Sequence, residues 1–302
     1  MTIKNKFEIS LDMFINFALY DKKKGYYMQK NAFGLKGDFI TAPNISRMFS
    51  EMIAVWILGF WENLGTPKKI NLVELGAGNG EMMKIFLETF KKFPAFLSSC
   101  NILIHEKSLK LKKIQKDKLD KEKIIWITDL KEIKKFPTIF IANEFFDAMA
   151  IKQFIKKKDI WFERYVIFKN KKKVFFDEKI FNMRKFEKEI GYDISKNQKF
   201  IEYSLVGVSY LEKITDIIKK NSGGLLIIDY GYMEKKMKNT LKSISNHKHS
   251  SVLKNIGKSD ITHNINFYLF KKIIDQSGGL KDLITTQGSF LVKLGIKKKL
   301  FL

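Results

Sequence analysis

A glycine-rich turn is the part of the sequence best suited to bind a small ligand. Residues 73–80 read VELGAGNG, so Gly76, Gly78 and Gly80 alternate with other residues. Glycines permit a tight turn and let a ligand approach the backbone without a Cβ clash. A helix that begins here adds free N–H groups and a positive dipole end. A nicotinamide site prefers the spacing G-x-G-x-x-G, which is absent here. A plain strand–helix turn without a ligand is the alternative.

Acidic side chains accompany the ends of the first three expected strands. Glu74 lies just before the glycines, and Glu106 follows the strand expected at 101–105. A carboxylate at position 106 can accept hydrogen bonds from both hydroxyls of a ribose. Asp129 follows the next expected strand, and it either accepts from an adenine amino group or is an ordinary loop aspartate.

A second polar group follows the strand expected at 137–143, where the sequence reads NEFFD. Ligands of open α/β sheets bind beyond the carboxyl ends of the strands, where the strand order reverses. The carboxylates of Glu144 and Asp147, with the amide of Asn143, are therefore predicted to bind a cationic nucleophile and take its proton. Asp147 could instead cap the helix that follows.

Strands that alternate with helices position these residues. We expect strands at 70–75, 101–105, 123–128, 137–143 and 225–230, and helices at 10–20 (with Ser10 as N-cap), 45–64, 81–91 and 108–119. This alternation predicts a parallel α/β sheet. Apolar runs punctuated by Lys and Asp at 152–177 predict β-hairpins, and the polar stretch 231–262 predicts mostly loop. The expected domains are an N-terminal helical region, 1–66, and a ligand-binding domain, 67–302, with an insertion at about 151–222.

The net charge of +24 comes from 56 basic and 32 acidic residues. Only three of the basic residues are arginines, the residue type that favours base readout and phosphate clamps. We interpret the charge as composition drift, so nucleic acid is not the expected partner. No apolar run reaches the roughly 18–20 residues of a membrane span, and residues 1–10 carry no secretory or transit signal. A cytoplasmic location is expected in a bacterium, and the mitochondrial matrix in a eukaryote.

Metal chemistry is not expected from this sequence. The single cysteine, Cys100, excludes a thiolate-rich zinc site. His247, His249 and His263 lie in or beside the polar stretch, where histidines are usually solvated or hydrogen-bonded. No metal site is therefore predicted.

Several segments together resemble one known family. The acidic residue before G-x-G is typical of S-adenosylmethionine methyltransferases. In order, the sequence also contains GDFITAP (37–43), NEFFDA (143–148), W-x-E-R (161–164), IDYGY (228–232), DIT (260–262) and TQG-x-FL (286–291). This order is similar to that of the MidA-like family of S-adenosylmethionine-dependent protein arginine methyltransferases linked to complex I assembly. The family's Pro and Arg inside the glycine turn are Ala77 and Asn79 here.

The resemblance implies a Rossmann-like class I methyltransferase sheet and S-adenosylmethionine as cofactor. It implies a protein substrate, such as a complex I subunit, methylated on arginine. It also implies that Glu74, Gly76, Gly78, Gly80, Glu106 and Asp129 bind the cofactor, with Asn143, Glu144 and Asp147 as catalytic residues. The segment around Asp38 is either a lid over the cofactor or an ordered connection. An RNA methyltransferase and a non-catalytic assembly factor that binds the cofactor remain alternatives, and the oligomeric state is left open between monomer and homodimer.

Overall fold

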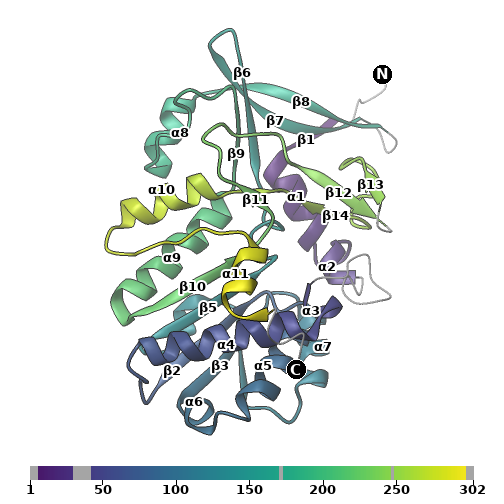
Figure 1. Cartoon of the computed structure of the whole chain (residues 1–302). Helices are drawn as coiled ribbons and strands as arrows, with labels where there is room; N and C mark the ends of the chain where they lie inside the picture. The colour runs from purple at the N-terminus through teal and green to yellow at the C-terminus, as the bar shows by residue number, and fades with distance from the viewer. Residues whose placement is uncertain (1–5, 30–41, 170–172, 246–247, 297–302) are drawn as a thin grey trace. The chain divides into compact units, whose positions relative to one another are not determined.

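The computed structural model describes residues 6–29, 42–169, 173–245 and 248–296 (Figure 1). They form two compact units. Unit 1 comprises residues 1–29, 146–212 and 230–276, and unit 2 comprises residues 30–145, 213–229 and 277–302. The expected helical region, 1–66, contributes to both units. The domain boundary expected near residue 66 stays a prediction.

Unit 2 is built on a five-stranded parallel sheet. Its strand order is β10(Gly223–Ile228), β5(Thr138–Asn143), β2(Ile70–Leu75), β3(Cys100–His105), β4(Ile124–Ile127). Each strand was expected from its apolar run, and the central strand β2 is buried along its whole length. From β2 the chain moves outward through β3 and β4, and then returns to β5 on the other side. The order therefore reverses between β2 and β5, which is where α/β sheets bind ligands.

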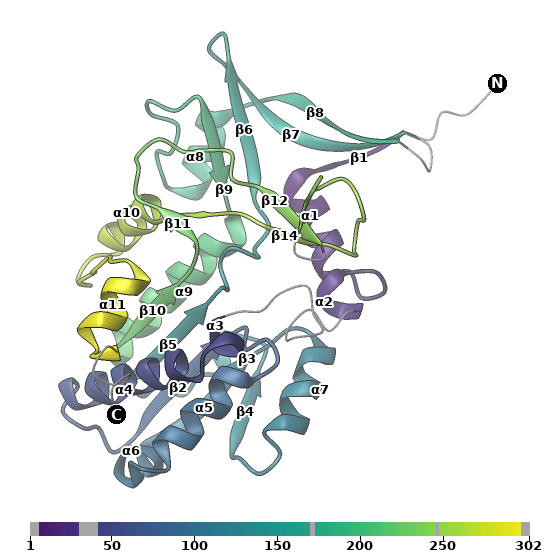
Figure 2. The same ribbon diagram turned by 45° about the vertical axis from the view of Figure 1, so that its right-hand side comes forward.

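Helices of unit 2 pack on this sheet. They are α3(Ala42–Ile45), α4(Arg47–Asn63), α5(Glu81–Phe90), α6(Pro94–Ser99), α7(Leu109–Lys118) and α11(Gln287–Lys293). Helices α4 and α5 lie side by side (Figures 1 and 2). Ile53 and Ile57 of α4 and Phe86 of α5 share one buried apolar cluster with Leu72 and Ile139 of the sheet. Burying such side chains is the main favourable term in folding, at about 1.5–3 kcal/mol each.

In its described residues, unit 1 contains an antiparallel sheet, four whole helices and the beginning of a fifth that continues into unit 2. The sheet joins β1(Lys6–Ser10), β7(Ile160–Lys169), β6(Lys152–Lys157) and β9(Phe200–Tyr203), and β8(Lys173–Phe181) pairs with β7. The helices are α1(Leu11–Tyr20), α2(Tyr26–Gln29), α8(Met183–Ile190) and α10(Phe267–Ser277). Strands β6, β7 and β8 confirm the expected hairpins. Ser10 is the N-cap of α1, but its hydroxyl donates to Asp12 rather than accepting from the helix.

Residues 231–262 are mostly loop, as expected, but they also contain short strands that were not expected. This stretch contains β11(Gly231–Tyr232), β12(Lys242–Ser245), β13(Lys248–Ser250) and β14(Asp260–Thr262). Strand β12 pairs with β13 and β14, and β11 pairs with β15(Ile265–Asn266). The strands are two to four residues long and mostly polar, so they carry no run or alternation that a sequence pattern could reveal. Helix α9(Leu205–Asn221) joins the two units in the chain.

Among the described residues, no helix is both long and apolar enough to cross a bilayer.

Candidate active site

A cavity of about 40 Å³ opens at the carboxyl ends of β2 and β5 in unit 2. Its walls include five residues predicted from the sequence: Glu74, Gly76, Gly78, Asn143 and Glu144. The remaining wall residues are Pro43, Ala77, Asn79, Glu81 and Met82. The cavity therefore lies where the strand order reverses. Pro43 is the described end of the GDFITAP segment, whereas Asp38 lies outside the described residues.

The glycine turn has a backbone that other residues adopt poorly. The φ angles of Gly76, Gly78 and Gly80 are 67°, 54° and 78°, in the left-handed region that favours glycine. A Cβ on Gly76 would lie only 2.8 Å from the ring of Phe145. Gly80 is the N-cap of α5 and does not line the cavity. The turn thus leads the backbone closely past the cavity and into a helix N-terminus.

Two buried acceptor atoms in the cavity wall are notable. Glu74 is 2% exposed, and neither its Oε2 nor Oδ1 of Asn143 has a hydrogen-bond partner within the part of the chain that the structure describes. Burial, and to a smaller extent the charge of Glu106, raise the pKa of Glu74 to about 8. Buried acceptors are normally satisfied. These two oxygens therefore suit a ligand that brings N–H donors, and above all an ammonium group.

Glu144 has an uncommon backbone conformation. Its φ is 47°, a region that non-glycine residues occupy rarely and at a cost of order 1–3 kcal/mol. Its backbone N–H donates to the carbonyl of Ile228 at 2.9 Å, which ties the residue to the end of β10. The sheet thus holds Glu144 in a strained position in the cavity wall, and strain of this kind is typical of functional residues.

Glu106 is fixed by a residue that sequence reasoning missed. Oε1 of Glu106 accepts from the backbone of Ser108 at 2.8 Å, and Oε2 accepts from Nε2 of Gln115 at 3.0 Å. The same Gln115 nitrogen donates to the carbonyl of Gly78 at 2.9 Å, and its Oε1 accepts from the indole of Trp126 at 3.0 Å. Gln115 is fully buried. Its signal in the sequence is modest: one amide, one helical turn after the buried Leu111, on a lysine-rich helix.

Glu106 and Asp129 do not line the cavity. Asp129 is exposed and caps the short 3₁₀ helix Leu130–Glu132, where its carboxylate accepts from the backbone of Lys131 at 3.0 Å. This is the role of an ordinary loop aspartate. Adenine contact by Asp129 and ribose contact by Glu106 stay predictions.

Asp147 belongs to unit 1 and is 6% exposed. Turns follow it and lead to β6, so the alternative that it caps a helix is wrong. Its backbone carbonyl accepts from the N–H of His263 at 3.1 Å. A catalytic role for Asp147 stays a prediction.

The described ranges hold no group of three or more His, Cys, Asp or Glu side chains that could bind a metal ion. His247 lies outside these ranges.

Comparison with known proteins identifies the family. The profile of the S-adenosyl-L-methionine-dependent methyltransferase family Methyltransf_28 matches residues 52–286. The chain belongs to this family. It is 30% identical to the protein arginine methyltransferase NDUFAF7, mitochondrial, of Xenopus laevis, over 99% of this chain and 73% of that protein. The human protein of the same name is 28% identical, over 99% of this chain and 72% of its own length.

A solved structure shows the same fold. A COG1565 superfamily member from Burkholderia thailandensis, bound to S-adenosyl-homocysteine, superimposes with a TM-score of 0.80. It is 21% identical, over 97% of this chain and 78% of that one. The predicted class I methyltransferase fold is therefore confirmed. Family membership confirms that the protein is a methyltransferase and that its cofactor is S-adenosylmethionine.

The cavity suits one part of this cofactor. A volume of about 40 Å³ holds only a compact polar group, and the oxygens of Glu74 and Asn143 fit the ammonium of its amino-acid end. The glycine turn allows the rest of the molecule to approach the backbone. These residues therefore fit S-adenosylmethionine.

Replacing Glu106 with alanine is expected to weaken S-adenosylhomocysteine binding by about 1.5–3 kcal/mol, the worth of a charge-assisted contact. Glu106→Asp should lose less. Titration calorimetry measures both variants, with Glu122→Ala as a control because Glu122 only pairs with Lys91 on the surface. Unchanged affinity in Glu106→Ala would remove Glu106 from the cofactor site.

Cofactor affinity should rise with pH because of Glu74. Below a pH of about 8 the Glu74 carboxyl is held protonated, whereas a ligand ammonium favours the ionised form. Affinity for S-adenosylhomocysteine should therefore increase between pH 6 and 8, by up to about tenfold per unit, and level off near pH 8. Calorimetry across this range tests the slope, which Glu74→Gln should flatten. A flat profile in the parent protein would show that Glu74 does not meet the ammonium.

Proposed function

We propose that this protein transfers a methyl group from S-adenosylmethionine to an arginine side chain of a protein substrate. The observation that carries the proposal is the strained Glu144, which lines the cofactor cavity beside Asn143 and Glu74. A carboxylate fixed in that wall suits a cationic side chain as methyl acceptor. The similarity to proteins named protein arginine methyltransferase supports the same substrate class.

The reaction depends more on alignment of the acceptor nitrogen with the methyl group than on general acid–base catalysis. When bound, S-adenosylmethionine supplies an electrophilic methyl group on its sulfonium. A guanidinium is a poor nucleophile because it is always protonated in water. The Glu144 carboxylate accepts charge-assisted hydrogen bonds from the guanidinium N–H groups and localises the positive charge on the two far nitrogens. The near nitrogen then keeps electron density for in-line attack on the methyl carbon as the sulfur–methyl bond breaks, and its proton passes to a carboxylate of the site or to water during or after transfer. Positioning of this kind can contribute several kcal/mol to catalysis.

The family resemblance supports a proposal for the substrate and the location. A complex I subunit is the proposed substrate, in keeping with the MidA-like family. The similar vertebrate proteins are named mitochondrial, whereas a bacterial source would place the protein in the cytoplasm. A homodimer is compatible with the proposal and is not required by it.

Incubation with S-adenosylmethionine labelled in its methyl group tests the proposal directly. The protein is added to a lysate of its own organism, and mass spectrometry locates the labelled residues. Labelled methylarginine in a protein, absent with Glu144→Gln, is the expected result. Label found only in RNA would support the RNA methyltransferase. Cofactor binding without labelling would support the non-catalytic assembly factor.

A further inference from the structure

The side-chain amide of Gln115 in α7 joins three other segments of unit 2. Its Nε2 donates to Oε2 of Glu106, after β3, at 3.0 Å, and to the carbonyl of Gly78, after β2, at 2.9 Å. Its Oε1 accepts from the indole N–H of Trp126, in β4, at 3.0 Å. The side chain is fully buried. Nitrogen and oxygen of this amide are therefore both engaged by the protein itself.

The partners of this amide determine which way round it lies. An indole N–H can only donate a hydrogen bond, so the oxygen of Gln115 must face Trp126. A backbone carbonyl can only accept, so the nitrogen must face Gly78. The same nitrogen then donates to the Glu106 carboxylate. If the amide were turned over, the contacts with Trp126 and Gly78 would fail together, and the carboxylate would lose its donor.

The stem of Gln115 also contacts the end of the glycine turn. A Cβ on Gly80 would lie 3.5 Å from Cγ and 3.6 Å from Cα of Gln115, which is ordinary van der Waals contact. Gln115 thus meets the turn at two places, through the carbonyl of Gly78 and beside Gly80. Because Gly78 lines the cofactor cavity, a change at Gln115 reaches the cavity wall and the Glu106 carboxylate at the same time.

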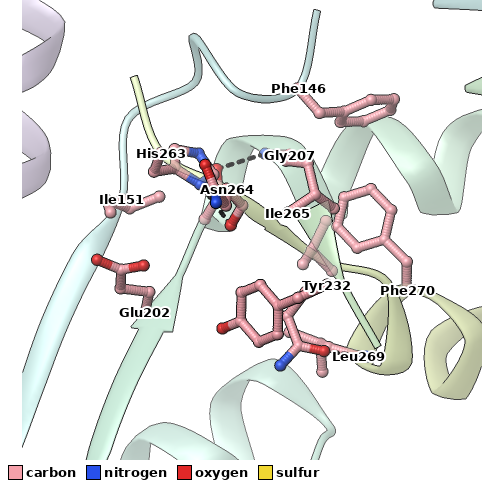
Figure 3. Close-up of a pocket in the computed structure, with 13 residues that line it drawn as sticks. Phe146, Ile151, Glu202, Gly207, Tyr232, His263, Asn264, Ile265, Leu269 and Phe270 are labelled. Atoms are coloured by element: carbon pink, nitrogen blue, oxygen red, sulfur yellow. Dashed lines mark hydrogen bonds between the residues drawn. The ribbon is translucent and has the colours of Figure 1, made fainter. Parts of the chain in front are cut away.

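A second buried glutamine holds a buried glutamate in unit 1. Nε2 of Gln153 donates to Oε1 of Glu202 at 2.7 Å, and Glu202 lies in the wall of a cavity of about 30 Å³ (Figure 3). Glu202 also accepts from the hydroxyl and backbone N–H of Thr240 and from the backbone N–H of Leu241. Four donors occupy a carboxylate with about four acceptor sites. The pair in unit 1 is therefore a structural counterpart with which the pair in unit 2 can be compared.

We propose that Gln115 is a positioning residue of the cofactor site, whose amide holds the Glu106 carboxylate in a fixed place relative to the glycine turn. Groups that are already in place need no reordering when a ligand binds, which favours affinity. The inference goes beyond the proposed function, because it concerns binding of S-adenosylmethionine and not the methylated substrate. It depends on the expected contact between Glu106 and the cofactor.

A double-mutant cycle measured by titration calorimetry with S-adenosylhomocysteine tests this inference. Gln115→Met keeps the length of the side chain but removes both N–H donors, and it should weaken binding about tenfold. In the Glu106→Ala background the same replacement should cost only about threefold, since only the contact with Gly78 remains to be lost. Gln115→Leu is a second apolar variant with the same expected losses, should methionine disturb the packing.

Gln153→Met is the matched control, because it also removes a buried amide from a buried carboxylate, but in unit 1. It should lower the melting temperature and leave S-adenosylhomocysteine affinity unchanged. Circular dichroism and thermal unfolding establish that each variant is folded.

Equal losses in the two backgrounds would show that Gln115 acts by packing alone and would overturn the proposal. Parent-like affinity in folded Gln115→Met or in Glu106→Ala would overturn it too, as would an equal loss in Gln153→Met. The cycle measures binding alone, so its outcome is independent of whether labelled methyl groups reach arginine.

Discussion

Replacing Glu144 with glutamine is expected to abolish methyl transfer while changing S-adenosylhomocysteine affinity by less than about twofold. Glutamine keeps the shape and one acceptor oxygen but removes the charge that holds a guanidinium. An arginine left in a desolvated site without its carboxylate costs about 3–5 kcal/mol, which corresponds to a loss in turnover of roughly two to three orders of magnitude or more. A catalytic role therefore appears in turnover and not in cofactor binding.

Labelled-methyl transfer into a lysate protein, beside calorimetry, separates these two quantities. Glu62→Gln is the matched control, since Glu62 is exposed near the end of α4. If Glu144→Gln methylates as well as the parent, Glu144 is structural. Asp147→Asn is then the next variant to measure.

Gly78→Val should eliminate measurable cofactor binding in a protein that still folds. The φ angle of Gly78 is 54°, which a β-branched residue adopts only with strain, and the Cβ and two methyl groups of valine would lie in the wall of the unit 2 cavity. The carbonyl of Gly78 is also the acceptor for Gln115, so a shifted turn would disturb Glu106 as well. We expect the affinity for S-adenosylhomocysteine to fall at least about a hundredfold in calorimetry.

Gly59→Val gives the matched control. Gly59 lies in α4 with no heavy atom within 4 Å of the added Cβ position, so this variant should bind as the parent does. Circular dichroism and thermal unfolding establish that both variants are folded. Parent-like affinity in folded Gly78→Val would remove the glycine turn from the cofactor site.

The parallel sheet could be predicted because each of its strands can be recognised from its own stretch of sequence. Segments such as 70–75 and 137–143 are short, mostly apolar runs between turn residues, which is typical of strands buried on both faces. The antiparallel pairs of 231–262 could not be predicted, since their strands are only three or four residues long and mostly polar. Helix α9 has buried Val208, Leu211 and Ile214 at helical spacing. It lies largely inside the insertion expected at 151–222, and it was not predicted as a separate helix.

The candidate site was predictable where it follows the strand ends. Glu74, Gly76, Asn143 and Glu144 converge because neighbouring parallel strands bring their carboxyl ends to one edge of the sheet. Gln115 could not be found in this way, since its importance lies in three contacts made by one side chain to distant segments. The two unsatisfied oxygens of Glu74 and Asn143 were equally invisible, because burial and the absence of a partner are tertiary properties.

The contact between Trp126 and Gln115 gives the protein an optical reporter of its own. The indole N–H donates to the amide that also holds Gly78 and Glu106, so a ligand that draws on either group alters the polarity around that ring. Only three other tryptophans contribute to the emission. The fluorescence of this one residue should thus follow occupancy of the cofactor site in real time, without a label and without turnover. The variant Trp126→Phe should remove the change in fluorescence.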